Sequence, residues 1–460
     1  MRALRRALGM DGAVAFTFLA RLTNVVASTG TVLLIVRFLT PAEQGYYYTL
    51  ASLVALQMVF ELGFSFVILQ LAAHETARLT LFPDGSIEGD PVAHTRLASV
   101  FQLTVKWYLR AAVALALLLL PLGIAFFARK GGTANHVAWF GPWVAAVFAV
   151  SLSFLLTPLF SFLEGCNQVR PIARMRMVQS LVSLVLAWTA IASGHGLYAS
   201  ALVNSGSIAI GAGLLYSRRK LLLGLLRFPG AATAVSWRDE VWPFQWKIAI
   251  AWLSSYFTFQ VFTPILFAIR GPQEAGRMGL SLSIVAYIPF VALCWITPKA
   301  APFGRLVNLG RLRELDRLFF RALRQSFALV VAVAAACELG VIAARRVLPG
   351  IASRMESPRV FVLLLAAAAG SFLVQSLAVY LRSFKREPYL AQSVAVALLT
   401  TAVARLTASR WGSAAIALDY FAVSGVLGLT WALLIFRSFR RSFRERSFGA
   451  LPLRDAQQAG

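Results

Sequence analysis

The feature that most constrains this chain is a series of long apolar runs, each separated from the next by a short polar break. A transmembrane helix needs about 20 largely apolar residues. Hydrophobic residues make up 59% of the 460 residues, and charged residues only 14%. These proportions exclude a soluble enzyme and a disordered chain. We therefore predict an all-α integral membrane protein with about twelve spans, at 14–38, 43–72, 99–127, 138–163, 173–193, 197–216, 246–269, 277–300, 321–344, 359–381, 389–408 and 412–436.

The basic residues predict how these spans are oriented. Lys and Arg number 44 against 19 Asp and Glu, which gives a net charge of +25. With a cytoplasmic N-terminus, roughly three-quarters of the basic residues outside the spans fall on the cytoplasmic side, as the positive-inside rule requires. We therefore interpret the charge as a topology signal rather than a nucleic-acid surface. The predicted organisation is a basic N-terminus (1–13), a six-helix lobe (14–216), a basic connector (217–245), a second six-helix lobe (246–436) and a basic tail (437–460), with both termini cytoplasmic.

A short motif occurs once in each half. Pro41-Ala42-Glu43-Gln44-Gly45 follows the first span, and Pro272-Gln273-Glu274-Ala275-Gly276 follows the seventh, 231 positions later. A P-x-E-x-G match at the equivalent turn of both halves predicts an internal parallel repeat. Two such lobes around a central cavity are a transporter architecture.

Polar residues at helical spacing mark two early spans. Thr17, Arg21, Asn24, Ser28 and Thr31 form one stripe in the first span, and Gln57, Glu61 and Ser65 form another in the second. Ionisable groups inside a bilayer are costly and need a partner or a purpose. In one interpretation the stripes line a hydrated cavity in which Arg21 binds phosphate and Glu61 positions it. In the other, Arg21 and Glu61 form a structural ion pair that clamps the two helices.

Further candidates lie in the second half. The seventh span carries two polar stripes, one with Lys247 and one with Tyr256 and Gln260, and we expect one of them to face the cavity. An interfacial position at the membrane surface is the alternative for Lys247. Candidates for ion coupling are Glu61, Glu338 and Asp419, although a structural salt bridge between Asp419 and Arg405 is the simpler expectation. The segment 311–324 is basic on one face and apolar on the other, which predicts a helix lying on the inner leaflet and a possible contact with anionic membrane lipid.

Several stretches resemble the polysaccharide-transporter branch, the O-antigen-type flippases, of the multidrug/oligosaccharidyl-lipid/polysaccharide exporter (MOP) superfamily. They are Arg37-Phe-Leu-Thr-Pro-Ala-Glu-Gln-Gly-Tyr46, Glu61-Leu-Gly-Phe64, Glu164-Gly165-Cys166-Asn167 and Trp242-Pro-Phe-Gln-Trp-Lys-Ile-Ala249. The resemblance implies a flippase in the bacterial inner membrane that carries undecaprenyl-pyrophosphate-linked oligosaccharide from the inner to the outer leaflet. It also implies a lipid-linked oligosaccharide as cargo, and polysaccharide polymerase or export machinery as further partners.

Two alternatives remain open from the residues. The first is an ion-coupled small-molecule exporter, and the second is a membrane-embedded sugar polymerase or glycosyltransferase. Walker A, G-x-S-x-G and H-E-x-x-H motifs are absent from the sequence. The three cysteines, Cys166, Cys294 and Cys337, have no metal-ligand spacing. We therefore expect no catalytic residue, no metal and no cofactor.

Overall fold

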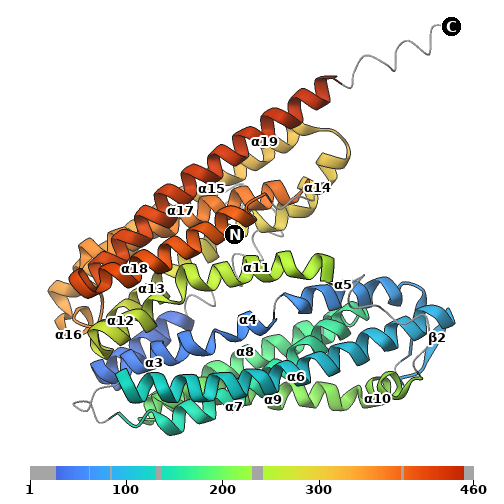
Figure 1. The fold of residues 1–460 in the computed structure, drawn as a ribbon, viewed down its shortest axis with the longest axis horizontal. Coiled ribbons are helices and arrows are strands. Elements are labelled where there is room, and N and C mark those ends of the chain that lie inside the picture. Colours follow the sequence, from blue (N-terminus) through green and yellow to red (C-terminus); the bar gives the residue numbers. More distant parts are fainter. Residues whose placement is uncertain are drawn as a thin grey trace, which may run out of the picture. The chain divides into compact units, whose positions relative to one another are not determined.

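The computed structural model describes residues 27–61, 63–82, 85–130, 137–229, 242–384 and 388–449, and most of them are α-helical. The chain divides into two compact units (Figure 1). We call Ala27–Leu280 the first unit and the part from Ser281 onward the second unit.

Within the described residues, eight helices are long and apolar enough to cross a membrane, or nine if one bent pair counts as a single span. They match predicted spans three to six and eight to twelve, with the last helix covering both the eleventh and the twelfth span, and the bent pair is the predicted second span. The prediction of an all-α membrane protein is therefore confirmed. The eight are Pro91–Lys130, Phe140–Gly165, Val169–Ala192, Gly196–Ser217, Pro272–Asn308, Leu312–Val347, Pro358–Arg382 and Leu390–Arg441.

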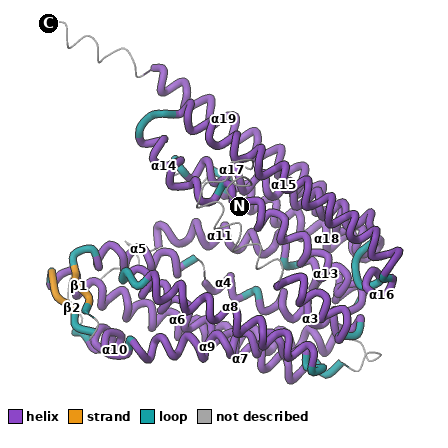
Figure 2. The backbone as a smooth tube through the Cα atoms, turned by 180° about the vertical axis from the view of Figure 1, so that it is seen from behind, coloured by secondary structure: helices purple, strands orange, loops and turns teal. Residues whose placement is uncertain are grey.

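The first unit is built around a bundle of α5 (Phe64–Thr76), α6 (Pro91–Lys130), α7 (Phe140–Gly165), α8 (Val169–Ala192) and α9 (Ala199–Ser217). In this bundle α7 packs against α5, α6 and α9, and α8 packs against α9. A short antiparallel hairpin, β1 (Leu79–Leu81) with β2 (Ile87–Gly89), joins α5 to α6. It is the orange pair at one end of the bundle in Figure 2. The short helix α10 (Arg219–Arg227) packs on α6 at this end.

The predicted second span is broken rather than continuous. It consists of α3 (Pro41–Val54), α4 (Gln57–Glu61) and α5, and the axis bends by 41° between Pro41–Glu61 and Phe64–Thr76. Gly63 lies at this break with φ of 67°, in the left-handed region that glycine adopts without steric cost. Gln57, Glu61 and Ser65 therefore do not form one uninterrupted helical stripe.

The two copies of the P-x-E-x-G motif contact each other within the first unit. Pro41 opens α3, and a capping box between Thr40 and Glu43 closes its first turn. The Gln44 side-chain amide donates to the Gly276 carbonyl oxygen at 2.9 Å. A Cβ atom on Gly45 would lie 1.9 Å from the Pro272 carbonyl oxygen, at the start of α13 (Pro272–Ala292). Glycine in the motif is thus required for close backbone approach.

The second unit contains α14 (Ala300–Asn308), α15 (Leu312–Val347), α16 (Pro349–Ala352), α17 (Pro358–Arg382), α18 (Leu390–Asp419) and α19 (Leu429–Gly449). A π-helical segment, Tyr420–Gly428, joins α18 to α19 and packs on α17. The non-helical torsions of Gly412 (φ 62°, ψ −139°) interrupt α18. Thr407 donates to Asp419 across this glycine at 2.5 Å, whereas residues twelve apart in a continuous helix are about 18 Å apart. The chain therefore reverses at Gly412, where the eleventh and twelfth spans were predicted to meet.

The prediction of a separate surface helix at 311–324 is wrong. These residues form the first turns of α15, which continues as one helix into the ninth span. Leu315, Phe319 and Ala322 are buried, as the apolar face predicts. Asp316 on the same helix forms an ion pair with Arg440 of α19 and accepts a hydrogen bond from Tyr380 of α17. The segment 311–324 therefore packs against α17 and α19 of the second unit.

Candidate functional site

Glu61 is the last residue of α4 and lies beside the break in the second span. Its half-buried carboxylate is within hydrogen-bonding reach of the Ser65 hydroxyl on α5. Ser65 in turn lies 3.3 Å from the Tyr108 hydroxyl on α6. The buried Tyr108 ring stacks on Phe64 with centroids 5.7 Å apart. A carboxylate is therefore held at the junction of three helix segments by hydroxyl groups.

The structure brings α4 together with the predicted seventh span. That span is two helices, α11 (Trp242–Phe259) and α12 (Phe262–Arg270), and α4 packs against α11. Gln57 and Glu61 on α4 thus lie beside α11. Lys247 is part of α11, and Gln260 directly follows its last residue. Of these residues, Gln57, Glu61 and Gln260 are half-buried.

Tyr256 has a different role from the one expected of a cavity residue. Its side chain is only 3% exposed, and its hydroxyl donates to the Ser52 carbonyl oxygen of α3 at 3.1 Å. This bond ties α11 to α3. Tyr256 therefore supports the packing of the first and second halves of this unit.

The stripe predicted in the first span is described only in part. Arg21 and Asn24 lie outside the described residues, and so does any ion pair between Arg21 and Glu61. Ser28 is half-buried in the helix Ala27–Phe38. One turn later, the Thr31 hydroxyl accepts a hydrogen bond from the Trp188 indole of α8 at 2.9 Å. This end of the stripe therefore faces the helix bundle of its own unit.

Glu338 and Asp419 lie in the second unit. One carboxylate oxygen of Glu338 on α15 is buried and has no hydrogen-bond partner within the described residues, although Arg345 on the same helix lies close enough to act on its charge. Asp419 is bonded to Thr407. The described ion pairs do not include the expected one between Asp419 and Arg405, because Arg405 points outward and is exposed.

Sequence reasoning missed Glu356, which lies in a predicted outside loop. Its side chain is only 4% exposed, and one carboxylate oxygen accepts a hydrogen bond from Ser413 at 2.9 Å. Its backbone N–H donates to Ser281 at 3.0 Å. A carboxylate between two polar turns has no periodic signature, and loops are normally solvated, so no sequence pattern marks Glu356 as a site residue.

Comparison with known proteins identifies the fold. No family model matches the sequence, and no curated protein matches it. One similar structure is described as the inward-facing conformation of a multidrug resistance MATE family transporter of the MOP superfamily. The match covers 91% of this chain and 99% of the transporter chain, with a TM-score of 0.53 and 12% identity. The fold is that of a MOP-superfamily transporter. This fold consists of two lobes, as predicted.

Two further structures share the MOP fold. The first is the lipid II flippase MurJ in an inward closed conformation. The match covers 91% of this chain and 87% of the MurJ chain, with a TM-score of 0.59 and 10% identity. The second is a MOP-superfamily transporter from Pyrococcus furiosus, described as having a binding pocket of reverse polarity. The match covers 93% of this chain and 95% of the transporter chain, with a TM-score of 0.52 and 11% identity. At these identities the likeness establishes the fold alone.

Proposed function

We propose that this protein is a flippase that moves a lipid-linked oligosaccharide from the inner to the outer leaflet of the bacterial cytoplasmic membrane. The observation that carries the proposal is the broken second span, which holds Glu61 and Gln57 against α11 in the MOP fold. Discontinuous helices with polar groups at the break are how transporters of this kind build a site inside the bilayer.

The cargo sets the chemistry that the site must perform. An anionic head group bearing sugars has to cross about 30 Å of hydrocarbon. In our proposal Arg21 binds the pyrophosphate, because a guanidinium matches phosphate oxygens in pairs. Glu61 positions that arginine, and Gln57, Asn24, Ser28 and Gln260 provide hydrogen bonds to the head group. The lipid tail stays in the bilayer, and no covalent step is required.

Energy for net movement comes from an ion gradient or from the membrane potential. One elementary charge that crosses 100 mV gains about 2.3 kcal/mol. The carboxylates available for coupling are Glu61 in the first unit and Glu338 and Asp419 in the second. We favour Glu61, because it lies at the helix break, whereas Asp419 is bonded within a turn.

A second candidate function is ion-coupled export of small molecules, because a MATE multidrug transporter shares the fold over 91% of this chain. Such an exporter depends on a carboxylate more than on a basic residue. The two candidates therefore differ in whether Arg21 or Glu61 is essential.

The test is to delete the protein in its native host and measure the leaflet in which lipid-linked oligosaccharide accumulates. A flippase predicts accumulation in the inner leaflet, reversed by the wild-type chain. If unpolymerised units accumulate in the outer leaflet, the protein acts as a polymerase instead. If the lipid-linked pool is unchanged while cells become sensitive to toxic small molecules, the exporter is the better description.

A further inference from the structure

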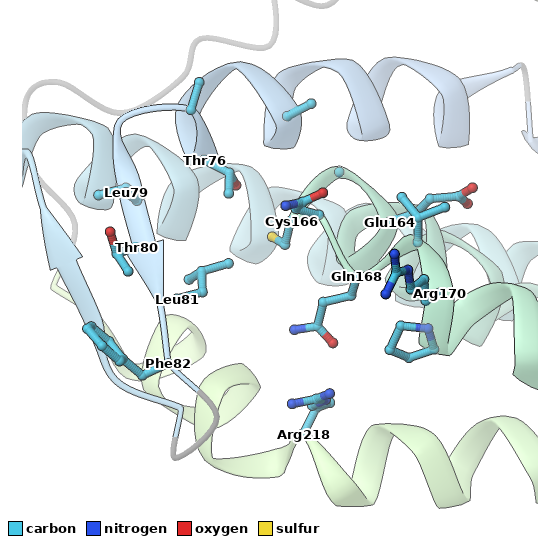
Figure 3. Close-up of a pocket in the computed structure, with 16 residues that line it drawn as sticks. Thr76, Leu79, Thr80, Leu81, Phe82, Glu164, Cys166, Gln168, Arg170 and Arg218 are labelled. Atoms are coloured by element: carbon cyan, nitrogen blue, oxygen red, sulfur yellow. The ribbon is translucent and has the colours of Figure 1, made fainter.

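A pocket of about 1130 Å³ lies at the end of the first unit that carries the hairpin and α10 (Figure 3). Its walls are the end of α5, strand β1, the turn between α7 and α8, and the junction of α9 with α10. All of these elements belong to the first unit. None of the residues assigned above to the transport path lines this pocket.

The pocket has an excess of positive charge. Arg170 and Arg218 line it, and within the described chain neither is paired with a carboxylate. Glu164 also lines it, but Arg176 neutralises that carboxylate through an ion pair of 2.8 Å. Burial raises the pKa of the Cys166 thiol to about 12, so the thiol carries no charge that would oppose an anion.

Two polar atoms in this pocket are buried without a hydrogen-bond partner in the described structure. They are Nε of Arg218 and Oε1 of Gln168. Figure 3 shows the Gln168 amide directed toward Arg218 across the pocket. Buried polar groups in folded proteins are nearly always satisfied, so an unsatisfied donor and acceptor facing one cavity indicate a missing ligand. The donor matches an anionic oxygen, and the acceptor matches a hydroxyl group.

The rim of the pocket is apolar and exposed. Phe82 and Val169 both line the pocket and are 40% and 50% exposed. Next to them, α10 buries Leu221 and Leu225 and leaves Leu223 exposed. The same helix carries three basic residues, Arg219, Lys220 and Arg227. A basic helix with exposed leucines is typical of a membrane interface.

The position of α10 along α6 agrees with that interface. The Gln102 side chain of α6 donates to the carbonyl oxygens of Leu225, Leu226 and Phe228, at 3.1, 3.3 and 2.8 Å. Gln102 is about 40 Å along the helix from Lys130, where α6 ends. A bilayer with its head groups is about 40–45 Å thick. If Lys130 lies at one surface, the end of α10 that Gln102 contacts lies at the level of the lipid phosphates of the other surface, and the pocket lies at the opposite end of this short helix.

We infer that Arg170, Arg218 and Gln168 bind a phosphate group that carries a hydroxylated substituent, such as the glycerol phosphate head of phosphatidylglycerol. The two guanidinium groups bind the phosphate oxygens, and the Gln168 Oε1 accepts from a hydroxyl of the substituent. The site is separate from the proposed transport path, and it does not depend on what the protein transports.

The test measures binding to the full-length protein. The protein is placed in phosphatidylcholine nanodiscs containing a titrated fraction of phosphatidylglycerol, and native mass spectrometry gives the apparent Kd of the first retained phosphatidylglycerol. We expect the double variant Arg170→Gln, Arg218→Gln to weaken this Kd by about tenfold or more. The matched control Arg174→Gln, Arg227→Gln removes the same charge from exposed positions of α8 and α10 outside the pocket, and we expect less than a twofold change.

A second variant guards against loss of folding. Val169→Glu adds a carboxylate at the exposed rim, and we expect it to weaken phosphatidylglycerol binding as well. Equal binding by the wild type and both pocket variants would overturn the inference, as would an equal loss in the control.

A soluble probe separates the two sources of the phosphate group. Glycerol 3-phosphate is titrated into the detergent-solubilised protein and its binding is measured. Binding of phosphatidylglycerol but not of glycerol 3-phosphate, with the arginine dependence above, assigns the site to lipid. Arginine-dependent binding of glycerol 3-phosphate alone assigns it to a soluble phosphate ester. Binding of neither overturns the site.

Discussion

Gly45 and Gly276, the last residues of the two P-x-E-x-G motifs, are in direct backbone contact. A Cβ on Gly276 would lie 2.8 Å from the Gly45 amide nitrogen, closer than real Cβ atoms approach other heavy atoms. Two turns 231 positions apart in the chain thus pack against each other without intervening side chains. Both copies of the motif therefore take part in one contact.

We expect Gly45→Ala to destabilise the first unit. Its new Cβ would lie 1.9 Å from the Pro272 carbonyl oxygen, which is backbone and cannot rotate away. Overpacking of this kind costs about 1–3 kcal/mol, and it should lower the melting temperature in detergent. Gly213→Ala is the control, because a Cβ there meets nothing within 4 Å. If the Gly45→Ala protein has the same melting temperature as the wild type, the contact is not tightly packed.

We expect Gln102→Leu to release α10 from α6. The substitution leaves three carbonyl oxygens at the end of α10 without their donor, at a cost of about 1–3 kcal/mol. Hydrogen exchange of residues 219–228 should accelerate by about tenfold or more. Thr95→Ala serves as the control, since that hydroxyl bonds only to its own helix at Pro91. Unchanged exchange in the Gln102 variant would argue that Leu221 and Leu225 hold the helix without help.

Arg21→Ala should abolish export of the lipid-linked oligosaccharide while the protein still reaches the membrane. Arg21→Lys should restore only part of the activity, because an ammonium lacks the paired geometry of a guanidinium. Arg405→Ala is the matched control, since Arg405 also lies within a predicted span and is exposed. Normal export by the Arg21→Ala protein would remove Arg21 from the mechanism.

Glu61→Gln distinguishes the two candidate functions. The amide keeps the size of the carboxylate and its bond to Ser65 but removes the charge. If the protein is a flippase, we expect Glu61→Gln to reduce transport less than Arg21→Ala does. If it is an ion-coupled exporter, the order should reverse. Both variants are measured in one transport assay at equal membrane abundance.

Acidification should loosen the contact between α10 and α6. Burial lowers the pKa of His94, whose ring lies 4.3 Å from Phe228 at the end of α10, below its ordinary value of 6.5. The unfolded segment therefore binds more protons than the folded one below about pH 6.5, so stability falls as the pH falls. After correction for the pH dependence of intrinsic exchange, the protection factors of residues 219–228 should be lower at pH 5.5 than at pH 7.5. His94→Gln should remove most of this difference, and an unchanged pH dependence would assign it to other groups.

The sequence predicts the membrane-spanning architecture well because each span is a local property of about 20 residues. The P-x-E-x-G motif predicts an internal parallel repeat, but only the structure shows that Gly45 meets Pro272 and Gly276. Contacts between distant segments leave no periodic pattern. For this reason the bond of Asp419 to Thr407 was predicted incorrectly as a bond to Arg405.

The candidate site was predictable only in part. Polar residues at helical spacing predict Glu61 and Ser65 as one stripe, but they do not predict that Ser65 links Glu61 to the Tyr108 hydroxyl. The phosphate pocket could not have been predicted, because Arg170 and Arg218 lie in separate connections and each reads locally as a topology signal. They line one pocket because α8 packs against α9 in the bundle.

The break at Gly63 has a mechanical consequence. Glu61 ends one helix and Ser65 lies in the first turn of the next, so their contact spans a joint that backbone rotation at a single glycine can reset. Rotation at such a hinge changes the angle between α4 and α5 without disrupting the hydrogen bonds inside either helix. We therefore expect a change in the charge state of Glu61 to change the angle of this membrane span, because the contact with Ser65 crosses the break.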